Sequence, residues 1–401
     1  MRILIISTNV VRWGGSEELW YNVANRLIDL GHEVMVSVFM HRPLANKVLL
    51  LKNKGVKIHQ RPFPSYFKGQ RFTGRVLAEF KLRTGLDKSK LDWVSVAKWN
   101  PNAILISSGE TFDYTINHES FIIKHCTQKQ VPYYLISQFN WEHDMDIDAG
   151  FRESHKELSQ KANGHFFVSY RNLKNAEMQI CGAISNARII TNPIKLKLEN
   201  PLPFPSLDTI KIAIVARLQT YIKGQDLFLQ AISSDEFKSV DFKISLYGGG
   251  DDLGHIKNLI QFYSLQDKVE LKGKVDDIAK IWEEHHLLAL PSRAEGTSLS
   301  LLEAMMCGRT AIVTNVGDSA LVIGNRGYVS ESNTVESLRK TLRITFSQKN
   351  NWETLGVECR DFVLENLKLD QDLEIAKCLT QEIDITEVGV KPEEYLNRSF
   401  L

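Results

Sequence analysis

The chain has 401 residues, which is long for one hydrophobic core and favours two domains. Hydrophobic residues make up 43% of the chain and charged residues 24%, proportions that are ordinary for a soluble globular protein. The formal net charge of +1 argues against a general attraction to nucleic acid. The 5 cysteines lack the spacing of a metal site, and no apolar run reaches transmembrane length. We therefore expect reduced thiols and a cytoplasmic protein.

The first half of the chain alternates short apolar runs with helical segments, a pattern typical of a parallel sheet covered by helices. Strands are expected near residues 2–8, 33–39, 56–60, 103–108, 132–137, 165–169 and 187–191. The first strand leads into Gly14 and Gly15, and paired glycines allow a ligand to approach the backbone closely. Ser16 then suits the N-cap of a helix that runs to about Leu30. A G-x-G-x-x-G motif is missing from this turn, which argues against a dehydrogenase.

The segment 61–90 interleaves basic and aromatic side chains, and only Glu79 and Asp87 oppose its positive charge. Such a mixture suits an anionic lipid surface or a phosphorylated acceptor. It equally suits a solvated loop and helix whose aromatic rings pack on the domain. Both interpretations stay open, and the first predicts peripheral contact with the inner face of a membrane.

The first domain is expected to cover residues 1–195 and to close with Thr191-Asn192-Pro193. The linker 200–205 contains three prolines, which stiffen it and prevent a helix. The second domain is expected to cover residues 206–370, with strands near 210–215, 242–247, 268–272, 287–290 and 310–314.

Basic and glycine residues follow two strands of this second domain. Arg217 and Lys223 come after the strand at 210–215, where they can clamp a diphosphate, because arginine offers a planar fork of donors and lysine a compact charge. Gly248, Gly249 and Gly250 follow the strand at 242–247. These glycines could face a phosphate, or they could form only a tight turn near a base or a ribose.

The segment Leu287–Gly317 has the pattern of a buried strand, a turn, a helix and a second strand. Ser298 can cap the helix and Gly308 can close it. The N–H groups at such a helix start attract phosphate, whereas Glu295 and Glu303 would repel it. Their expected task is to accept hydrogen bonds from sugar hydroxyls. A nucleotide-diphospho-sugar combines these hydroxyls and phosphates.

The E-x7-E spacing, with the surrounding P-S-R-x-E-G and L-L-E-A-M-x-C-G, resembles the retaining glycosyltransferases of family 4 (glycosyl transferases group 1), which have the GT-B fold of two Rossmann-like domains facing across a cleft. The R-x5-K-G spacing matches the same family. The resemblance implies that Glu295 contacts the donor sugar, that Glu303 contacts the ribose, and that Arg217 and Lys223 neutralise the donor phosphates. It also implies that backbone amides of the intervening turn contact the diphosphate and the sugar, at Gly296, Thr297, Ser298 and Leu299.

The same resemblance assigns further contacts. Gly14 and Gly15 would face the donor phosphates, and Gly249, Lys274 and Val275 would lie near the nucleotide. Relatives often carry a histidine after the strand at 132–137, where this chain has Gln138. Further acceptor-side candidates are Glu110 and His143, which would take the place of that histidine. The C-terminal helix, about 370–401, would cross back onto the first domain.

The resemblance implies a metal-independent reaction by front-face attack, in which a hydroxyl acceptor receives the sugar. The chain would need no cofactor, and a UDP-sugar is favoured over a GDP- or dTDP-sugar as donor. The acceptor could be a glycan, a lipid or a small molecule. The D-x-D spacing at Asp144 and Asp146 is interpreted as a loop, not a metal site. A GT-B epimerase and a non-catalytic sugar-nucleotide-binding protein stay open as alternatives, although Gln138 cannot titrate near neutral pH, which weakens the first.

Overall fold

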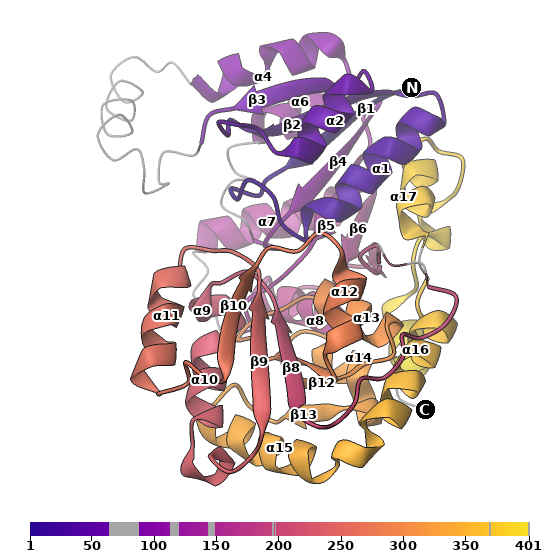
Figure 1. Cartoon of the computed structure of the whole chain (residues 1–401). Helices are drawn as coiled ribbons and strands as arrows, with labels where there is room; N and C mark the ends of the chain where they lie inside the picture. Colours follow the sequence, from indigo (N-terminus) through magenta and orange to yellow (C-terminus); the bar gives the residue numbers. More distant parts are fainter. Residues whose placement is uncertain are drawn as a thin grey trace. The chain divides into compact units, whose positions relative to one another are not determined.

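The computed structural model describes residues 1–63, 88–112, 120–142, 149–194, 196, 198–368 and 370–399. The chain forms two compact units, each built on its own parallel sheet (Figure 1). Unit 1 comprises Met1–Val168, Leu173–Pro193 and Asp370–Pro392. Unit 2 comprises Ser169–Asn172, Ile194–Leu369 and Glu393–Leu401.

Unit 1 contains a seven-stranded sheet with the order β3-β2-β1-β4-β5-β6-β7. All of its strand pairs are parallel. The strands are β1 (Arg2–Ser7), β2 (Glu33–Phe39), β3 (Lys57–Arg61), β4 (Ala103–Ser108), β5 (Tyr133–Ser137), β6 (Gly164–Phe167) and β7 (Ala187–Ile189). The helices of this part are α1 (Glu17–Asp29), α2 (Asn46–Asn53), α4 (Lys88–Trp99), α6 (Ser120–Gln128), α7 (Ala149–Lys161), α8 (Tyr170–Gln179) and α17 (Gln371–Leu379), with the short 3₁₀ turn η4 (Ile385–Glu387).

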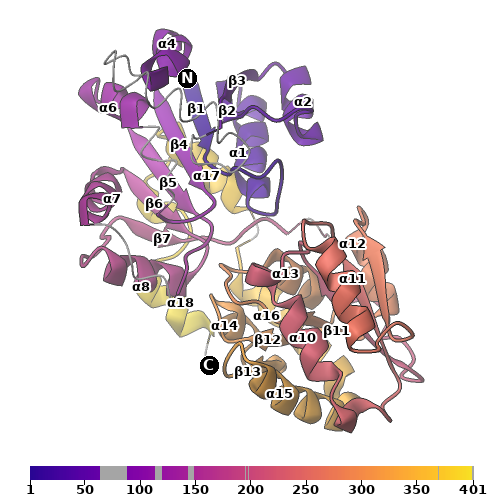
Figure 2. The same ribbon diagram turned by 90° about the vertical axis from the view of Figure 1, so that its left-hand side faces the viewer.

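Both faces of this sheet are covered, which explains why its central strands are apolar without alternation. Ile3 and Ile5 belong to a core that includes residues of α1 and α17. Leu4 and Ile6 belong to a second core that includes residues of α4 and α6. Figures 1 and 2 show α1 and α17 side by side against the sheet.

Unit 2 contains a six-stranded parallel sheet with the order β10-β9-β8-β11-β12-β13. Its strands are β8 (Ile210–Val215), β9 (Phe242–Tyr247), β10 (Val269–Gly273), β11 (Leu287–Leu290), β12 (Thr310–Thr314) and β13 (Tyr328–Ser330). Its helices are α9 (Thr220–Lys223), α10 (Gln225–Ile232), α11 (Leu253–Phe262), α12 (Ile278–Glu284), α13 (Leu299–Met306), α14 (Ser319–Ile323), α15 (Val335–Ser347), α16 (Trp352–Asn366) and α18 (Pro392–Ser399). Short 3₁₀ turns are η1 (Asp235–Phe237), η2 (Gly324–Arg326) and η3 (Lys349–Asn351).

Two cores also flank the sheet of unit 2. Ile212 and Ile214 pack with residues of α10, α11 and α15. Ala213 and Leu288 pack with residues of α12, α13 and α16. The carboxyl ends of the strands thus meet at one edge of a rigid, covered sheet, which is where ligands bind in folds of this kind.

The linker 200–205 contains no helix, as its prolines predict, and a buried arginine holds it. Arg309 is 1% exposed and donates hydrogen bonds to the carbonyl oxygens of Leu202 at 3.1 Å and Pro203 at 2.6 Å. Burial lowers the pKa of Arg309 to about 10. The guanidinium therefore fixes the entry of the chain into β8 by satisfying backbone carbonyls that would otherwise lack donors.

The parallel α/β architecture predicted from the sequence is confirmed, and the expected strands lie within two residues of observed ones. The strand β13 was not expected. It has only three residues and sits on the outer side of β12, so it lacks the long apolar run that marks the central strands.

Candidate functional site

The turn that follows β11 carries the first charged group of the candidate site. Glu295 is 6% exposed, and its Oε1 accepts hydrogen bonds from Lys223 Nζ at 2.6 Å and from Ser292 Oγ at 2.7 Å. A carboxylate removed from water needs such partners, because an unpaired buried charge is costly. The structure therefore brings together two residues that the sequence analysis selected from separate motifs.

Close backbone packing explains why Lys223 reaches Glu295. Gly224 has a φ of +62°, and a Cβ atom there would lie 1.9 Å from the carbonyl oxygen of Pro291. The N–H of Arg293 donates to the carbonyl oxygen of Ile222 at 2.7 Å. A side chain at position 224 would push α9 away from the turn, so the glycine of the K-G pair is a packing requirement.

A second ion pair lies beside the first. The guanidinium of Arg293 donates to both carboxylate oxygens of Asp226, at 2.8 and 2.7 Å, and to the carbonyl oxygen of Thr220 at 2.6 Å. This bidentate geometry fixes the direction of the guanidinium as well as its charge. Because Arg293 is paired with Asp226, Lys223 is the cation that pairs with Glu295.

Helix α13 begins directly after the turn, but its start differs from the expectation. Ser298 occupies the N-cap position, yet its hydroxyl pairs with Ser300 Oγ at 3.0 Å and makes no capping bond to the backbone. The first-turn N–H groups are thus not occupied by that side chain, as an anion site at a helix start requires. Glu303 is 7% exposed and lies at the fifth position of α13, about one turn along the helix. Gly308, with a φ of +75°, closes the helix as predicted.

The ends of β8 and β9 are packed main chain against main chain. A Cβ atom on Gly248 would lie 2.0 Å from the carbonyl oxygen of Ala216, and one on Gly250 would lie 2.2 Å from that of Leu218. These contacts favour the tight-turn interpretation for the two outer glycines. Gly249 differs, because a Cβ there would contact Lys274 Cε at 3.2 Å.

The loops after β8, β9 and β10 therefore lie together at one edge of the sheet. Arg217 is half-buried two residues beyond β8, and its carbonyl oxygen accepts from Gln225 Nε2 at 2.7 Å. Lys274 and Val275 follow β10 directly, with the lysine exposed. At this edge, Arg217 and Lys274 lie beside the glycine-rich turn 248–250.

In unit 1 the turn before α1 is organised by a buried carboxylate. Gly14 and Gly15 accept the N–H bonds of Glu17 and Glu18 at 3.2 Å each. Ser16 stands at the N-cap but makes no capping bond, contrary to the expectation. The Ser16 hydroxyl instead donates to Glu17, which is 4% exposed and accepts from four side-chain donors: Ser7 Oγ, Asn9 Nδ2, Ser16 Oγ and Trp20 Nε1.

The acceptor-side candidates follow β4 and β5 of unit 1. Gln138 is 6% exposed, and its Oε1 accepts from Asn192 Nδ2 at 3.0 Å. Glu110 is half-buried in the neighbouring loop, which the N–H of Thr111 joins to the Phe139 carbonyl at 2.9 Å. His143, the D-x-D segment and residues 64–87 of the basic–aromatic segment lie outside the described residues.

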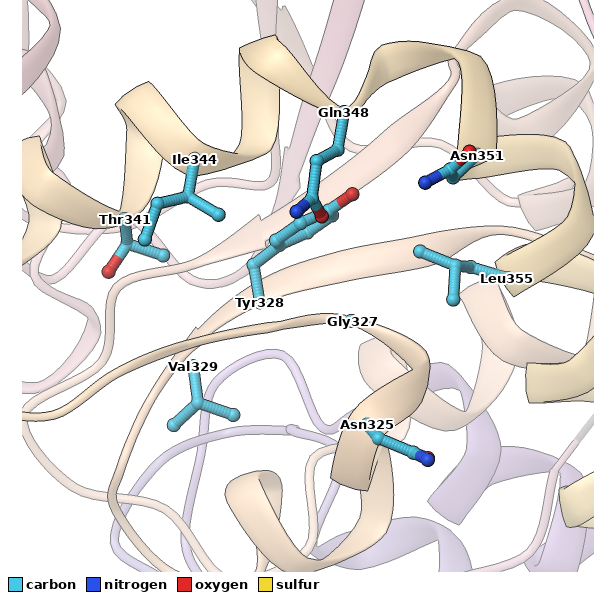
Figure 3. Close-up of a pocket in the computed structure, with 9 residues that line it drawn as sticks. All are labelled: Asn325, Gly327, Tyr328, Val329, Thr341, Ile344, Gln348, Asn351 and Leu355. Carbon is cyan, nitrogen blue, oxygen red and sulfur yellow. The ribbon is translucent and has the colours of Figure 1, made fainter.

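A cavity of about 310 Å³ in unit 2 lies apart from these motifs (Figure 3). Its lining comes from β13, α15, α16 and the turns beside them, with Tyr328, Gln348 and Asn351 among the side chains. None of the predicted site residues lines it.

Two structural features are absent from the described part of the chain. There, no helix is long and apolar enough to cross a membrane. Within the same residues, no group of three His, Cys, Asp or Glu side chains is arranged to hold a metal ion.

Sequence reasoning missed three groups that the structure adds. Ser292 bonds Glu295, Arg293 braces the turn, and Asn192 bonds Gln138. Ser292 and Arg293 stand in the quoted P-S-R-x-E-G string, three and two positions before Glu295, so their proximity was visible. Asn192 is separated from Gln138 by 54 positions, and only the sheet order brings them together.

Part of the chain is similar to known proteins. Residues 209–347 match the family "Glycosyl transferases group 1". An uncharacterized glycosyltransferase of Methanocaldococcus jannaschii is 28% identical over 144 residues, which are 35% of this chain and 39% of the relative. N-acetyl-alpha-D-glucosaminyl L-malate synthase of Bacillus anthracis is 30% identical over 134 residues, which are 33% of this chain and 35% of the relative. The chain therefore spans less than half the length of these curated relatives.

The fold extends further than the sequence similarity. The crystal structure of HepE from Anabaena in complex with UDP and glucose aligns with a TM-score of 0.70 at 14% identity, over 95% of this chain and 100% of that one. This likeness, with the two parallel-sheet units, confirms an α/β GT-B fold. The likeness to glycosyl transferases group 1 rests on residues 209–347, which lie within unit 2.

Proposed function

We propose that the chain is a retaining glycosyltransferase that moves a sugar from a nucleotide-diphospho-sugar to a hydroxyl acceptor. The observation that carries this proposal is the contact of Lys223 Nζ with Glu295 Oε1 at 2.6 Å, inside the region that matches the glycosyltransferase family. This contact supports the proposal because a cation suited to a phosphate and a carboxylate suited to a sugar hydroxyl lie within hydrogen-bond distance, just before a helix start.

In this proposal, unit 2 binds the donor. Arg217 and Lys223 neutralise the diphosphate, and the amides of Gly296, Thr297, Ser298 and Leu299 add hydrogen bonds to it. Glu295 accepts from a hydroxyl of the sugar and Glu303 from the ribose. Gly249, Lys274 and Val275 lie near the nucleotide.

Residues of unit 1 would complete the reaction. Gly14 and Gly15 would face the diphosphate, and Gln138, Glu110 and His143 would line the acceptor side. The basic–aromatic segment 61–90 stays a candidate for contact with an anionic membrane or a phosphorylated acceptor, and a cytoplasmic location stays a prediction.

The proposed reaction is a front-face substitution. The bond between the anomeric carbon and the diphosphate oxygen breaks, the acceptor oxygen bonds to the same face of that carbon, and the acceptor proton passes to the departing phosphate. The enzyme's part is electrostatic: cations and helix-start amides stabilise the charge on the leaving diphosphate, so that no metal ion is needed. Glu295 holds the sugar in a reactive pose.

UDP-sugars are the favoured donors, because a protein of the same fold was crystallised with UDP and glucose. The name of the Bacillus relative adds N-acetylglucosamine to the sugars that should be tried. GDP- and dTDP-sugars stay possible, and the acceptor is open among glycans, lipids and small molecules.

The proposal is tested by calorimetric titration of the protein with UDP-, GDP-, dTDP- and ADP-sugars, together with assays of slow hydrolysis. We expect selective binding of one donor that the Arg217→Ala variant loses. Binding without turnover in the presence of any acceptor would favour a non-catalytic sugar-nucleotide-binding protein. Absence of binding by folded protein would contradict the donor site itself.

A further inference from the structure

A fully buried carboxylate in unit 2 lies outside the predicted motifs. Asp318 stands at the N-cap of α14 and is 0% exposed. Its carboxylate accepts hydrogen bonds from Ser169 Oγ at 2.9 Å and from the backbone N–H groups of Tyr170 at 2.7 Å and Arg171 at 3.1 Å. These three donors belong to the short segment Ser169–Asn172, which is part of unit 2 and begins α8. One carboxylate therefore satisfies the exposed N–H groups of a helix start.

A fourth donor to Asp318 comes from the C-terminal part of the chain. Tyr395 lies on α18, is 7% exposed, and makes side-chain hydrogen bonds to both Asp318 and Thr297. Figure 2 shows α18 beside α14. A phenol has a single proton to donate, and an ionised carboxylate can only accept. The hydroxyl of Tyr395 therefore donates to Asp318 and accepts from the hydroxyl of Thr297.

The protonation chemistry agrees with this direction. Burial raises the pKa of Tyr395 well above its ordinary value, so the phenol keeps the proton that it donates. Burial also raises the pKa of Asp318, and the N–H and O–H donors around it oppose that rise. The cluster is thus held by hydrogen bonds in a setting of low dielectric constant, where such bonds are strong and their loss is costly.

The backbone of Asp318 contacts the turn Glu295–Ser298, which the side chain of Asp318 reaches through Tyr395. The N–H of Asp318 donates to the carbonyl oxygen of Gly296 at 3.1 Å. A Cβ atom on Gly317, whose φ is +51°, would lie 2.3 Å from that oxygen. The backbone of Asp318 therefore holds Gly296. The carboxylate of Asp318 holds Thr297 through the hydroxyl of Tyr395.

We infer that Asp318 and Tyr395 are positioning residues for the donor: they fix the turn Glu295–Ser298 so that its amides and the Glu295 carboxylate meet the sugar and the diphosphate. The inference rests on the proposed function, because it takes that turn as the donor site. A merely structural cluster would stabilise the segment Ser169–Asn172 and α18 and leave donor affinity unchanged. A positioning cluster changes donor affinity even where the fold is kept.

The test uses Tyr395→Phe, which removes one hydroxyl and leaves Asp318 with its three other donors. We expect the Kd for the donor that the wild type binds to rise roughly three- to tenfold, the loss typical of one hydrogen bond. Tyr328→Phe is the matched control, because Tyr328 is 6% exposed in the same unit and belongs to no part of the proposed site. Its Kd should equal that of the wild type.

A double-mutant cycle with Thr297→Val decides whether the bond between Thr297 and Tyr395 carries the effect. We expect the double variant to bind no more weakly than either single variant, because both remove the same link. Additive losses, or an unchanged Kd in Tyr395→Phe, would overturn the inference. If circular dichroism shows Tyr395→Phe unfolded, Thr297→Val alone takes its place, because it removes the same hydrogen bond from the other side, and an unchanged Kd there would overturn the inference. A wild type that binds no nucleotide-sugar would instead contradict the proposed function.

Discussion

The two units share a parallel sheet but differ in the chemistry that follows their strands. In unit 2 the candidate groups are charged and paired, as Lys223 and Glu295 are at 2.6 Å. In unit 1 a neutral amide follows β5 and another follows β7: Gln138 and Asn192, bonded at 3.0 Å. Charges at fixed spacing suit a ligand of constant chemistry, such as a diphosphate. Amides, which both donate and accept, suit hydroxyl groups in many arrangements. This difference explains why a donor can be proposed in detail and an acceptor cannot.

The charged half of this comparison is tested most severely by Glu295→Gln. The variant keeps the shape of the side chain but removes the charge that Lys223 and a sugar hydroxyl would meet. We expect turnover of the nucleotide-sugar to fall roughly 10²- to 10³-fold, about 3 to 4 kcal/mol, as when one preorganised polar group is lost from an active site. Initial rates with the preferred donor measure the effect.

The matched control is Asp226→Asn, which also converts a paired carboxylate of unit 2 into an amide. Asp226 pairs with Arg293 and has no proposed contact with the donor. Its variant should lose less than a tenth of the activity lost by Glu295→Gln. An equal loss of turnover in both variants would show that disturbing any ion pair of unit 2 disables it. That outcome would contradict a specific role for Glu295.

We expect acid to destabilise unit 1 before unit 2. His155 and His165 are each 2% exposed in unit 1, and burial lowers the pKa of His155 to about 4 and that of His165 to about 3. In unit 2, His285 and His286 also have lowered pKa values. A histidine whose pKa is lowered by folding stays neutral in the native state while the unfolded chain takes up a proton below pH 6.5. Stability is therefore complete above that pH and is lost as the pH falls toward the folded-state value.

For His155 the expected loss between pH 6.5 and about 4 is on the order of 3 kcal/mol. His155→Leu should flatten the pH dependence of unfolding, because its surroundings are the rings of Phe112 and Phe151. Hydrogen exchange resolved by peptide should show unit 1 opening first in acid. The same substitution at the exposed His255 of unit 2 serves as control. A parallel loss of slope in both variants would contradict the assignment.

Unit 2 depends on close backbone packing as well as on charge. Gly224→Ala tests this packing without changing any charge. The added methyl would meet the carbonyl oxygen of Pro291 at 1.9 Å on a backbone with a φ of +62°. We expect unit 2 to lose about 2 kcal/mol of unfolding free energy, because both the clash and the backbone conformation oppose a side chain. Denaturant titration measures this loss.

Gly254→Ala provides the comparison, because a Cβ at Gly254, within α11, meets nothing within 4 Å. Alanine there should be neutral or stabilise the helix by up to about 1 kcal/mol. Equal destabilisation by both substitutions would show that Gly224 is no special contact of the turn.

The sequence predicted most of the framework because long apolar runs define central strands of a covered sheet. It failed for β13, which has three residues. It also predicted side-chain caps at Ser16 and Ser298 from residue type alone. In the structure, Ser16 bonds to Glu17 and Ser298 pairs with Ser300, so nearby polar side chains compete for these hydroxyls.

The site was predictable where its residues lie close in sequence or form a charged motif. Glu295 and Lys223 were both selected, and the structure pairs them. Contacts made by neutral side chains over long separations were not predictable. The link from Asp318 to Ser169 spans 149 positions and has no motif to announce it. Such contacts depend on how loops leave the sheet, and residue type alone does not record that.

The smallest expected effect concerns Ser292, whose hydroxyl is the second donor to Glu295 Oε1 at 2.7 Å. Ser292→Ala removes this donor and leaves Lys223 in place, so the carboxylate stays paired but less firmly oriented. We expect turnover to fall two- to tenfold, about 1 kcal/mol, as for one net hydrogen bond. Ser319→Ala is the matched control: both serines are 0% exposed in unit 2, and within the described residues the Ser319 hydroxyl has no hydrogen-bond partner. Its variant should keep full activity. If the two variants lose the same amount of turnover, Lys223 alone orients Glu295. The difference between the units would then rest on the pair of Lys223 and Glu295.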